Sequence, residues 1–104
     1  MTHKRLDEIR QRIDKIKAEL AAIGDMRPGS LTRQYKDFAN QSGAYYQLSY
    51  TRGMKSRTEY VARDCVREVR REIANYKRFK ALTTQWVDLG IEHSRLRMKL
   101  ARRP

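Results

Sequence analysis

The sequence of 104 residues is poor in cysteine, proline, histidine and long apolar runs. Its one cysteine, Cys65, excludes an intrachain disulfide and favours a reducing compartment. No run approaches the roughly 18 apolar residues of a membrane-spanning helix. The N-terminus MTHKRLDEIR also lacks the apolar core of a secretion signal. The sequence therefore predicts a soluble, cytoplasmic chain without a membrane partner.

Side chains suited to catalysis or metal binding are also scarce. The two histidines, His3 and His93, lie far apart in the sequence, and with one cysteine they cannot form a standard zinc site. His93 falls among apolar residues, where a packed ring is expected, and Cys65 is expected to be a buried structural thiol. The carboxylates are scattered among basic residues, and the isolated glycines form no phosphate-binding loop. We therefore expect no catalytic residue, no metal, no cofactor and no enzymatic activity.

What the chain has in excess is positive charge. It contains 24 Lys and Arg against 12 Asp and Glu, a net charge of +12. Such an excess favours an anionic partner, and nucleic acid is predicted in preference to an anionic membrane surface, although solubility alone is an alternative. Residues 1–25 contain 6 basic and 5 acidic groups, whereas residues 26–104 contain 18 and 7. Nearly all of the excess therefore lies after the first segment.

The first segment has the repeat of an amphipathic helix. Its apolar residues alternate at spacings of three and four, at Leu6, Ile9, Ile13, Ile16, Leu20 and Ile23. This heptad seam predicts a helix over residues 2–24, with Gly24 as its C-terminal cap.

In the middle of the chain the sequence pattern changes from the helical repeat to one typical of β-strands, which predicts a β unit over residues 30–62. Residues 30–35 predict a short strand and residues 36–43 a loop. A hairpin follows, with Gly53 in the first central position of a type II′ turn.

Pairing Thr51 with Ser56 sets the register of this hairpin. One face then carries Tyr46, Leu48, Tyr50, Arg57, Glu59 and Val61, and is the better core face. The opposite face carries Tyr45 and Tyr60. These two rings could stack on unpaired bases, although tyrosines at this spacing more often pack across strands.

A second apolar stripe predicts a helix over residues 64–101, with Asp64 at its start. The stripe contains Val66, Val69, Ile73, Tyr76, Phe79, Leu82, Trp86, Leu89, His93, Leu96 and Leu100. A helix with a narrow apolar seam must pack that seam against another element, so the simplest arrangement packs the two helices against each other. The predicted fold is one α+β domain over residues 1–104, mostly α. Two long antiparallel, coiled-coil-like helices are joined in it by a small antiparallel β-hairpin or three-stranded β unit.

Two basic clusters are the candidate nucleic-acid-binding residues. At the hairpin tip, Arg52, Lys55 and Arg57 alternate with hydroxyl groups, a pattern suited to phosphate contacts, and a two-stranded ribbon fits the major groove of B-DNA. A solvated turn is the alternative interpretation. The second cluster, on the later helix, contains Arg67, Arg70, Arg71, Lys77, Arg78 and Lys80, partly neutralised by Glu68 and Glu72. Arg33, on the predicted first strand, is the remaining candidate nucleic-acid-binding residue.

Four segments resemble a family of small basic bacterial and archaeal proteins of unknown function. They are MRPGSL at residues 26–31, GAYYQLSY at 43–50, RTEYV at 57–61 and NYKRF at 75–79, and the resemblance spans about residues 23–100. It implies a helix–hairpin–helix arrangement and relatives that often lie near mobile genetic elements, but no activity. Many relatives have a cysteine-rich insert before the Gly-x-Tyr-Tyr stretch. This chain has residues 36–42 there, without cysteine, so no metal role is carried over.

These features predict a nonenzymatic accessory protein that binds DNA or RNA through phosphate contacts. The basic hairpin and the later helix would make these contacts, in association with a mobile element or a nucleoprotein complex. Two alternatives stay open. Two heptad helices around a hairpin also resemble prefoldin-type subunits, which favours a protein-interaction or chaperone-like module, although such subunits are commonly acidic. The chain could instead be a subunit of a larger complex, and its seam could also form a homodimer.

Overall fold

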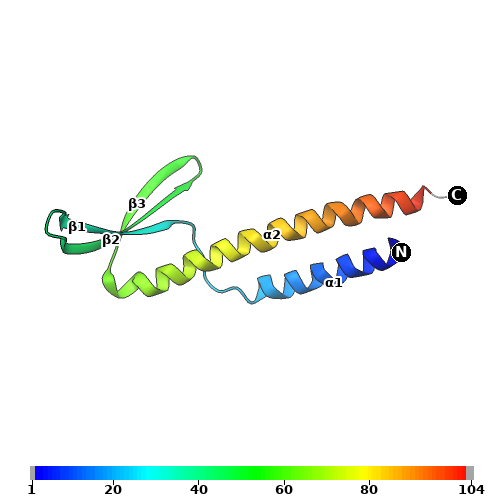
Figure 1. Ribbon diagram of the computed structural model, residues 1–104, viewed down its shortest axis with the longest axis horizontal. Helices are drawn as coiled ribbons and strands as arrows, with labels where there is room; N and C mark the ends of the chain where they lie inside the picture. Colours follow the sequence, from blue (N-terminus) through cyan, green and yellow to red (C-terminus); the bar gives the residue numbers. More distant parts are fainter. Residues whose placement is uncertain (1, 103–104) are drawn as a thin grey trace. The chain divides into compact units, whose positions relative to one another are not determined.

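A computed structural model of the chain describes residues 2–102. Its elements are helix α1 (Thr2–Ala21), strands β1 (Ser30–Asp37), β2 (Ser42–Arg52) and β3 (Lys55–Val61), the short 3-10 helix η1 (Arg63–Cys65) and helix α2 (Val66–Ala101), as Figure 1 shows. The α-helices contain 20 and 36 residues, and the strands form one antiparallel sheet in the order β1-β2-β3. The predicted α+β class, mostly α, is confirmed, and of the two predicted alternatives for the β unit the three-stranded one is observed.

The described residues form two compact units. Residues 2–23 and 78–102 form a helical unit, and residues 24–77 form a sheet unit. Helix α2 contributes its first part to the sheet unit and the rest to the helical unit. The single domain over residues 1–104 stays a prediction.

In the helical unit, α1 lies antiparallel beside the later part of α2 (Figure 1). Ile9, Ile13 and Ile16 of α1 are buried, as is Leu82 of α2, and the other residues predicted for the two seams in this unit are half-buried. Each buried aliphatic side chain stabilises the fold by about 1.5–3 kcal/mol through removal of apolar surface from water. Both seams are therefore confirmed as the packed faces of their helices.

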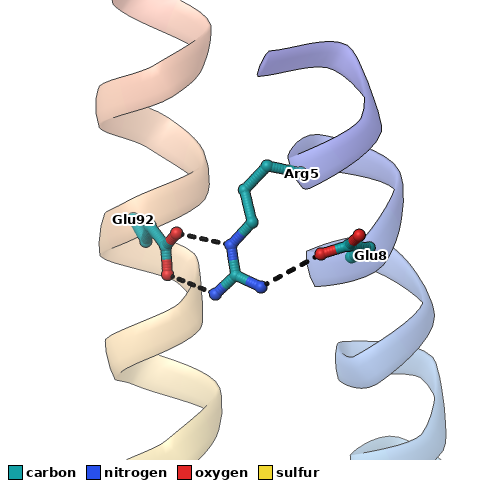
Figure 2. A network of polar contacts seen from close by, with 3 residues as sticks. All are labelled: Arg5, Glu8 and Glu92. Atoms are coloured by element: carbon teal, nitrogen blue, oxygen red, sulfur yellow. Dashed lines mark hydrogen bonds and ion pairs between the residues drawn. The ribbon is translucent and has the colours of Figure 1, made fainter. Parts of the chain in front are cut away.

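Polar contacts flank this apolar seam at intervals of seven residues on both helices. They join Arg5 to Glu92, Arg12 to Gln85 at 3.1 Å, and Arg78 to Glu19 at 3.8 Å. In Figure 2, the Arg5 guanidinium donates two hydrogen bonds to Glu92, at 2.7 and 2.8 Å, and a third to Glu8 at 3.4 Å. The bond from Arg5 lowers the pKa of Glu92 below its usual value, and Glu92 raises the pKa of Arg5. These contacts fix the antiparallel register, while the supercoil of a coiled coil stays a prediction.

In the sheet unit, the strand register puts the predicted core face against the first part of α2. Thr51 pairs with Ser56, as predicted. Leu48 and Val61 are buried and form a core with Ile73 of α2, and partly buried neighbours pack around it: Leu31, Tyr46, Tyr50, Val66 and Val69. Because side chains alternate between the faces of a strand, the opposite face of the sheet consists of the remaining residues.

The predicted loop over residues 36–43 is wrong. Strand β1 continues to Asp37 and β2 begins at Ser42, so only residues 38–41 form the turn. Lys36 and Asp37 lie on the edge strand β1, where polar side chains are tolerated. The sequence there shows no alternation of apolar and polar residues, so the strand could not be recognised from the pattern. The type II′ turn is also wrong. Gly53 and Met54 both have positive φ, 58° and 64°, which is the pattern of a type I′ turn.

The structure moves the end of the first predicted helix and the start of the second. Helix α1 ends at Ala21, not at residue 24, and the backbone N–H groups of Ala22 and Ile23 donate to carbonyls three residues earlier. These tighter bonds complete the last turn, so a left-handed glycine cap at Gly24 is not used. The later helix is preceded by η1, which begins after Ala62, so Asp64 is not its cap.

Cys65, predicted to be buried, is exposed. It lies in η1, one residue before the first turn of α2, and the apolar stripe that faces the sheet begins only at Val66. Cys65 therefore lies outside the core of the sheet unit.

Gly29 sits directly against the core of the sheet unit. Its φ is +147°, a conformation that L side chains rarely adopt, and a Cβ at this position would overlap the Leu48 side chain.

Gly29→Ala should therefore destabilise the fold by about 1–3 kcal/mol through overpacking. Leu48→Ala should cost about 2–5 kcal/mol through the cavity it leaves.

In the double variant, the methyl group introduced by Gly29→Ala would occupy space that the Leu48 side chain vacates. Urea unfolding should therefore give a combined cost clearly smaller than the sum of the two single costs. Costs that simply add would show that Gly29 is required for its backbone conformation and not for close packing.

Candidate nucleic-acid interface

All ten basic residues predicted to bind nucleic acid are exposed, but they do not form one cluster. Eight lie in the sheet unit: Arg33, Arg52, Lys55, Arg57, Arg67, Arg70, Arg71 and Lys77. The other two, Arg78 and Lys80, lie in the helical unit, where Arg78 pairs with Glu19. The predicted cluster over residues 67–80 is thus divided between the two units.

A row of basic side chains lines two adjoining hollows between α2 and the sheet. Arg63, Arg67 and Arg70 line one hollow together with Tyr46 and Val66. Arg70 and Lys77 line the next, beside residues 29–31 at the start of β1. Because Arg70 lines both, the hollows form one surface. We call the four side chains Arg63, Arg67, Arg70 and Lys77 the basic groove.

The spacing of these residues explains why they share one side of the helix. The steps from Arg63 to Arg67, Arg70 and Lys77 are four, three and seven residues, which return to the same side of a helix. The acidic residues Glu68 and Glu72 fall on another side. The four cations of the basic groove are therefore separated from Glu68 and Glu72 around the first part of α2.

Arg71 lies with the acids and not with the basic groove. It lines a separate hollow with Glu68 and Glu72, joined there by Asp25. That these two glutamates neutralise part of the cluster stays a prediction, and the sequence prediction did not separate Arg71 from Arg70. It also missed Arg63, because this residue precedes the apolar stripe, although its heptad spacing to Arg67 and Arg70 is visible in the sequence.

The hairpin tip carries a second, distinct basic cluster. Arg52 and Lys55 are direct cross-strand partners, and Arg57 is paired with Tyr50, so all three lie on the helix-facing side of the sheet. Like charges directly opposite one another destabilise a sheet. Arg52 is six residues along β2 from Tyr46, a separation of about 20 Å at 3.3 Å per residue. The tip is therefore a separate surface from the basic groove.

Arg33 lies next to the groove and not at the hairpin tip. It is the direct partner of Tyr46, which lines the basic groove, and its guanidinium carbon is 5.3 Å from the centre of the Tyr35 ring. Arg33 therefore lies on the same side of the sheet as the groove.

One arginine that the sequence prediction did not select, Arg27, has a structural role. Its Nη2 atom lies 3.3 Å from Glu59, its guanidinium covers the Tyr50 ring at 5.1 Å, and its backbone N–H donates to the Glu72 carbonyl. The Tyr50 hydroxyl donates to Glu59 at 2.7 Å. This bond and the Arg27 charge lower the pKa of Glu59 against the opposing effect of desolvation, and the same bond raises the pKa of Tyr50.

Removal of the Tyr50 hydroxyl should raise the pKa of Glu59. In the folded wild-type chain this pKa is below the ordinary value of 4.5, so ionised Glu59 stabilises the fold above that pH. The stabilisation is lost as the pH falls through the lowered pKa. Carbon NMR titration of the Glu59 carboxyl in Tyr50→Phe should give a pKa closer to 4.5 than in the wild type.

Tyr60→Phe is the matched control, because Tyr60 lies on the opposite face of the sheet. It should leave the Glu59 titration unchanged. An unchanged Glu59 pKa in Tyr50→Phe would mean that the hydrogen bond is not formed in solution.

The part of the chain that the structure describes lacks two other kinds of feature, a metal-binding cluster and a membrane-spanning helix. Within residues 2–102, no three or more His, Cys, Asp and Glu side chains gather where they could hold a metal ion. None of the described helices is long and apolar enough to cross a membrane.

The comparison with known families gives one match. The profile of DUF6788, a domain of unknown function, matches residues 6–71. No curated protein and no solved structure matches the chain. The match agrees with the resemblance to an uncharacterised family, but it begins and ends earlier than residues 23–100, so it includes the α1 seam and ends within the first part of α2.

Proposed function

We propose that this chain, which belongs to the DUF6788 family, is a nonenzymatic, cytoplasmic accessory protein that binds the phosphate backbone of nucleic acid. The observation that carries the proposal is the segregation of charge around the first part of α2. Four exposed basic side chains line the basic groove, whereas Glu68 and Glu72 lie on another side. Exposed arginines suit this role because a guanidinium can donate two parallel hydrogen bonds to one phosphate.

The length of the groove favours a polymer over a small anion. Fourteen residues separate Arg63 from Lys77, which is about 20 Å at the helical rise of 1.5 Å per residue. A row of this length spans several phosphates of one strand, which repeat about every 3.4 Å along the axis of duplex DNA. A single phosphate or sulfate ion would meet only one or two of the four cations.

The hairpin tip supplies a second phosphate contact in this proposal. Arg52 and Lys55 lie side by side, and the nearby hydroxyls of Thr51 and Ser56 are joined at 3.2 Å. Phosphate contacts of this kind position a protein on nucleic acid without reading its sequence. The link to mobile genetic elements that the resemblance implies stays a hypothesis.

The basic groove should set the salt dependence of binding. Replacement of Arg67, Arg70 and Lys77 together by Ala should weaken binding to duplex DNA. The slope of log K against log salt should fall by about two to three, because each phosphate that is no longer neutralised removes roughly 0.9 from it. Fluorescence anisotropy with duplex DNA, single-stranded DNA and structured RNA at several salt concentrations measures this slope.

The matched control removes the same charge elsewhere. Lys4, Arg10 and Lys15 are exposed on α1, in the helical unit, and replacing all three by Ala also lowers the net charge by three. This variant should keep most of the wild-type affinity and slope. Equal losses of affinity in both variants would show that the groove contributes only through the overall net charge. Salt-independent or absent binding of the wild type would overturn the proposed function.

A specific observation also favours a second function, self-association. Val87, Ile91 and Met98 are exposed apolar residues at spacings of four and seven on α2, in the helical unit. Asp88 and Glu92, of which Glu92 already pairs with Arg5 of the same chain, lie at one end of this stripe, and Arg95, Arg97 and Lys99 lie at the other. Antiparallel pairing with a second copy of the chain would therefore put acidic groups next to basic ones.

Self-association through this stripe should resist salt. Sedimentation velocity should detect a dimer at high ionic strength that Ile91→Glu dissociates, because the new charge would be buried in an apolar contact. Gln11→Glu adds the same charge at an exposed position of α1, away from the stripe, and should leave the dimer intact. A wild-type chain that sediments as a monomer would exclude this second function.

A further inference from the structure

The face of the sheet that does not form the core has an unusual composition. By the register, it carries Ser30, Thr32, Gln34, Lys36, Gly43, Tyr45, Gln47, Ser49, Thr51, Ser56, Thr58 and Tyr60. We call it the open face. Hydroxyl and amide groups dominate it, Lys36 is its one charged residue, and most of its side chains are exposed.

Both carboxylates of the strands lie on the other side. Asp37 pairs with Ser42 and Glu59 with Leu48, so both belong to the helix-facing side. A polyanion on the open face would therefore meet a lysine and many neutral hydrogen-bonding groups, but no negative side chain from the strands.

Two tyrosine rings form the centre of the open face. Gln47 pairs with Tyr60, so Tyr45 and Tyr60 are diagonal neighbours on adjacent strands, a relation that separates residues by about 7–8 Å. They line one hollow together with Lys36, Gly43 and Ala44. Tyr60 is 71% exposed, although an aromatic ring of this size gains stability from burial.

The exposed aromatic surface extends beyond these two rings. Phe38, in the turn that joins β1 to β2, is 82% exposed. It follows Lys36 by two residues, and Lys36 lines the tyrosine hollow. Exposed aromatic rings beside a cation are the combination that single-stranded nucleic acid uses, since every base has a face that can stack.

The open face is continuous with the basic groove at the start of β1. Ser30 belongs to the open face by register and also lines the hollow that contains Arg70 and Lys77. Its partner on β2 is Ser49, four residues from Tyr45, which is about 13 Å along the strand at 3.3 Å per residue. A strand held by its phosphates in the groove would reach the tyrosines by passing around the edge strand β1 at Ser30.

We infer that the open face binds unpaired bases of single-stranded nucleic acid by stacking on Tyr45 and Tyr60. The inference rests on the proposed function, because the basic groove supplies the electrostatic attraction and the open face adds a preference for unpaired bases. Duplex nucleic acid, whose bases are already stacked, binds through phosphate contacts alone.

The experiment compares a short fluorescein-labelled oligothymidylate with a duplex of the same length by fluorescence anisotropy. The wild type should bind the single strand more tightly. Tyr60→Ala should lose roughly tenfold in affinity for the oligothymidylate and keep its affinity for the duplex. Tyr60→Phe keeps a ring and should bind like the wild type, and Thr58→Ala, on the same strand and face, is the matched control.

A structural readout separates stacking from a general loss of affinity. Added oligothymidylate should shift the Tyr60 ring protons upfield in the proton NMR spectrum, as ring stacking requires, whereas added duplex should not. Because Tyr60 is largely exposed, its replacement is expected to leave the fold intact, and the amide spectrum checks this directly.

The outcomes distinguish the two proposals. If Tyr60→Ala binds the oligothymidylate as tightly as the wild type while the triple variant of the basic groove weakens both ligands, the stacking inference is overturned and the proposed function stands. If the wild type binds neither ligand, both are overturned.

Discussion

The apolar stripe of α2 is the constraint on which both units depend. An amphipathic helix such as α1 owes most of its stability to the packing of its apolar face, and a small sheet needs a helix or further strands to cover its own. Ile73 closes the core of the sheet unit with Leu48 and Val61, and Leu82 is buried in the helical unit. One continuous helix thus provides the apolar surface against which the rest of the chain folds.

This packing also determines where the charges lie. Once Val66, Val69 and Ile73 face the sheet, the remaining positions of the first part of α2 are divided between two sides. Arg67 and Arg70 fall beside the sheet, and Glu68 falls on another side. The basic groove is therefore a consequence of the same heptad pattern that builds the core. In the function we propose, these separated cations bind the phosphates of nucleic acid.

Periodic features of the fold could be predicted from the sequence. The seam from Leu6 to Ile23 and the pairing of Thr51 with Ser56 are confirmed, because burial on one face enforces a regular spacing. Features that depend on local backbone geometry were missed. Met54 adopts a positive φ that its side chain does not signal, and Cys65 precedes the packed stripe by a single residue.

The sequence alone predicted which residues could bind nucleic acid, but not which of them lie together in the structure. Composition identified the basic residues, but proximity in the sequence grouped Arg71 and Arg78 with Arg70, whereas helical phase and the division into two units separate them. Arg63 joins the groove through the short helix η1, which carries no apolar signal of its own.

The decisive experiment is a map of backbone amide chemical shifts during titration with an oligonucleotide at near-physiological salt. If the basic groove and the hairpin tip bind phosphates, the shifts should gather over residues 63–77, at the start of β1 and at residues 52–57, and residues 2–23 should change little. Shifts spread over α1, or confined to the apolar stripe around Ile91, would contradict this expectation.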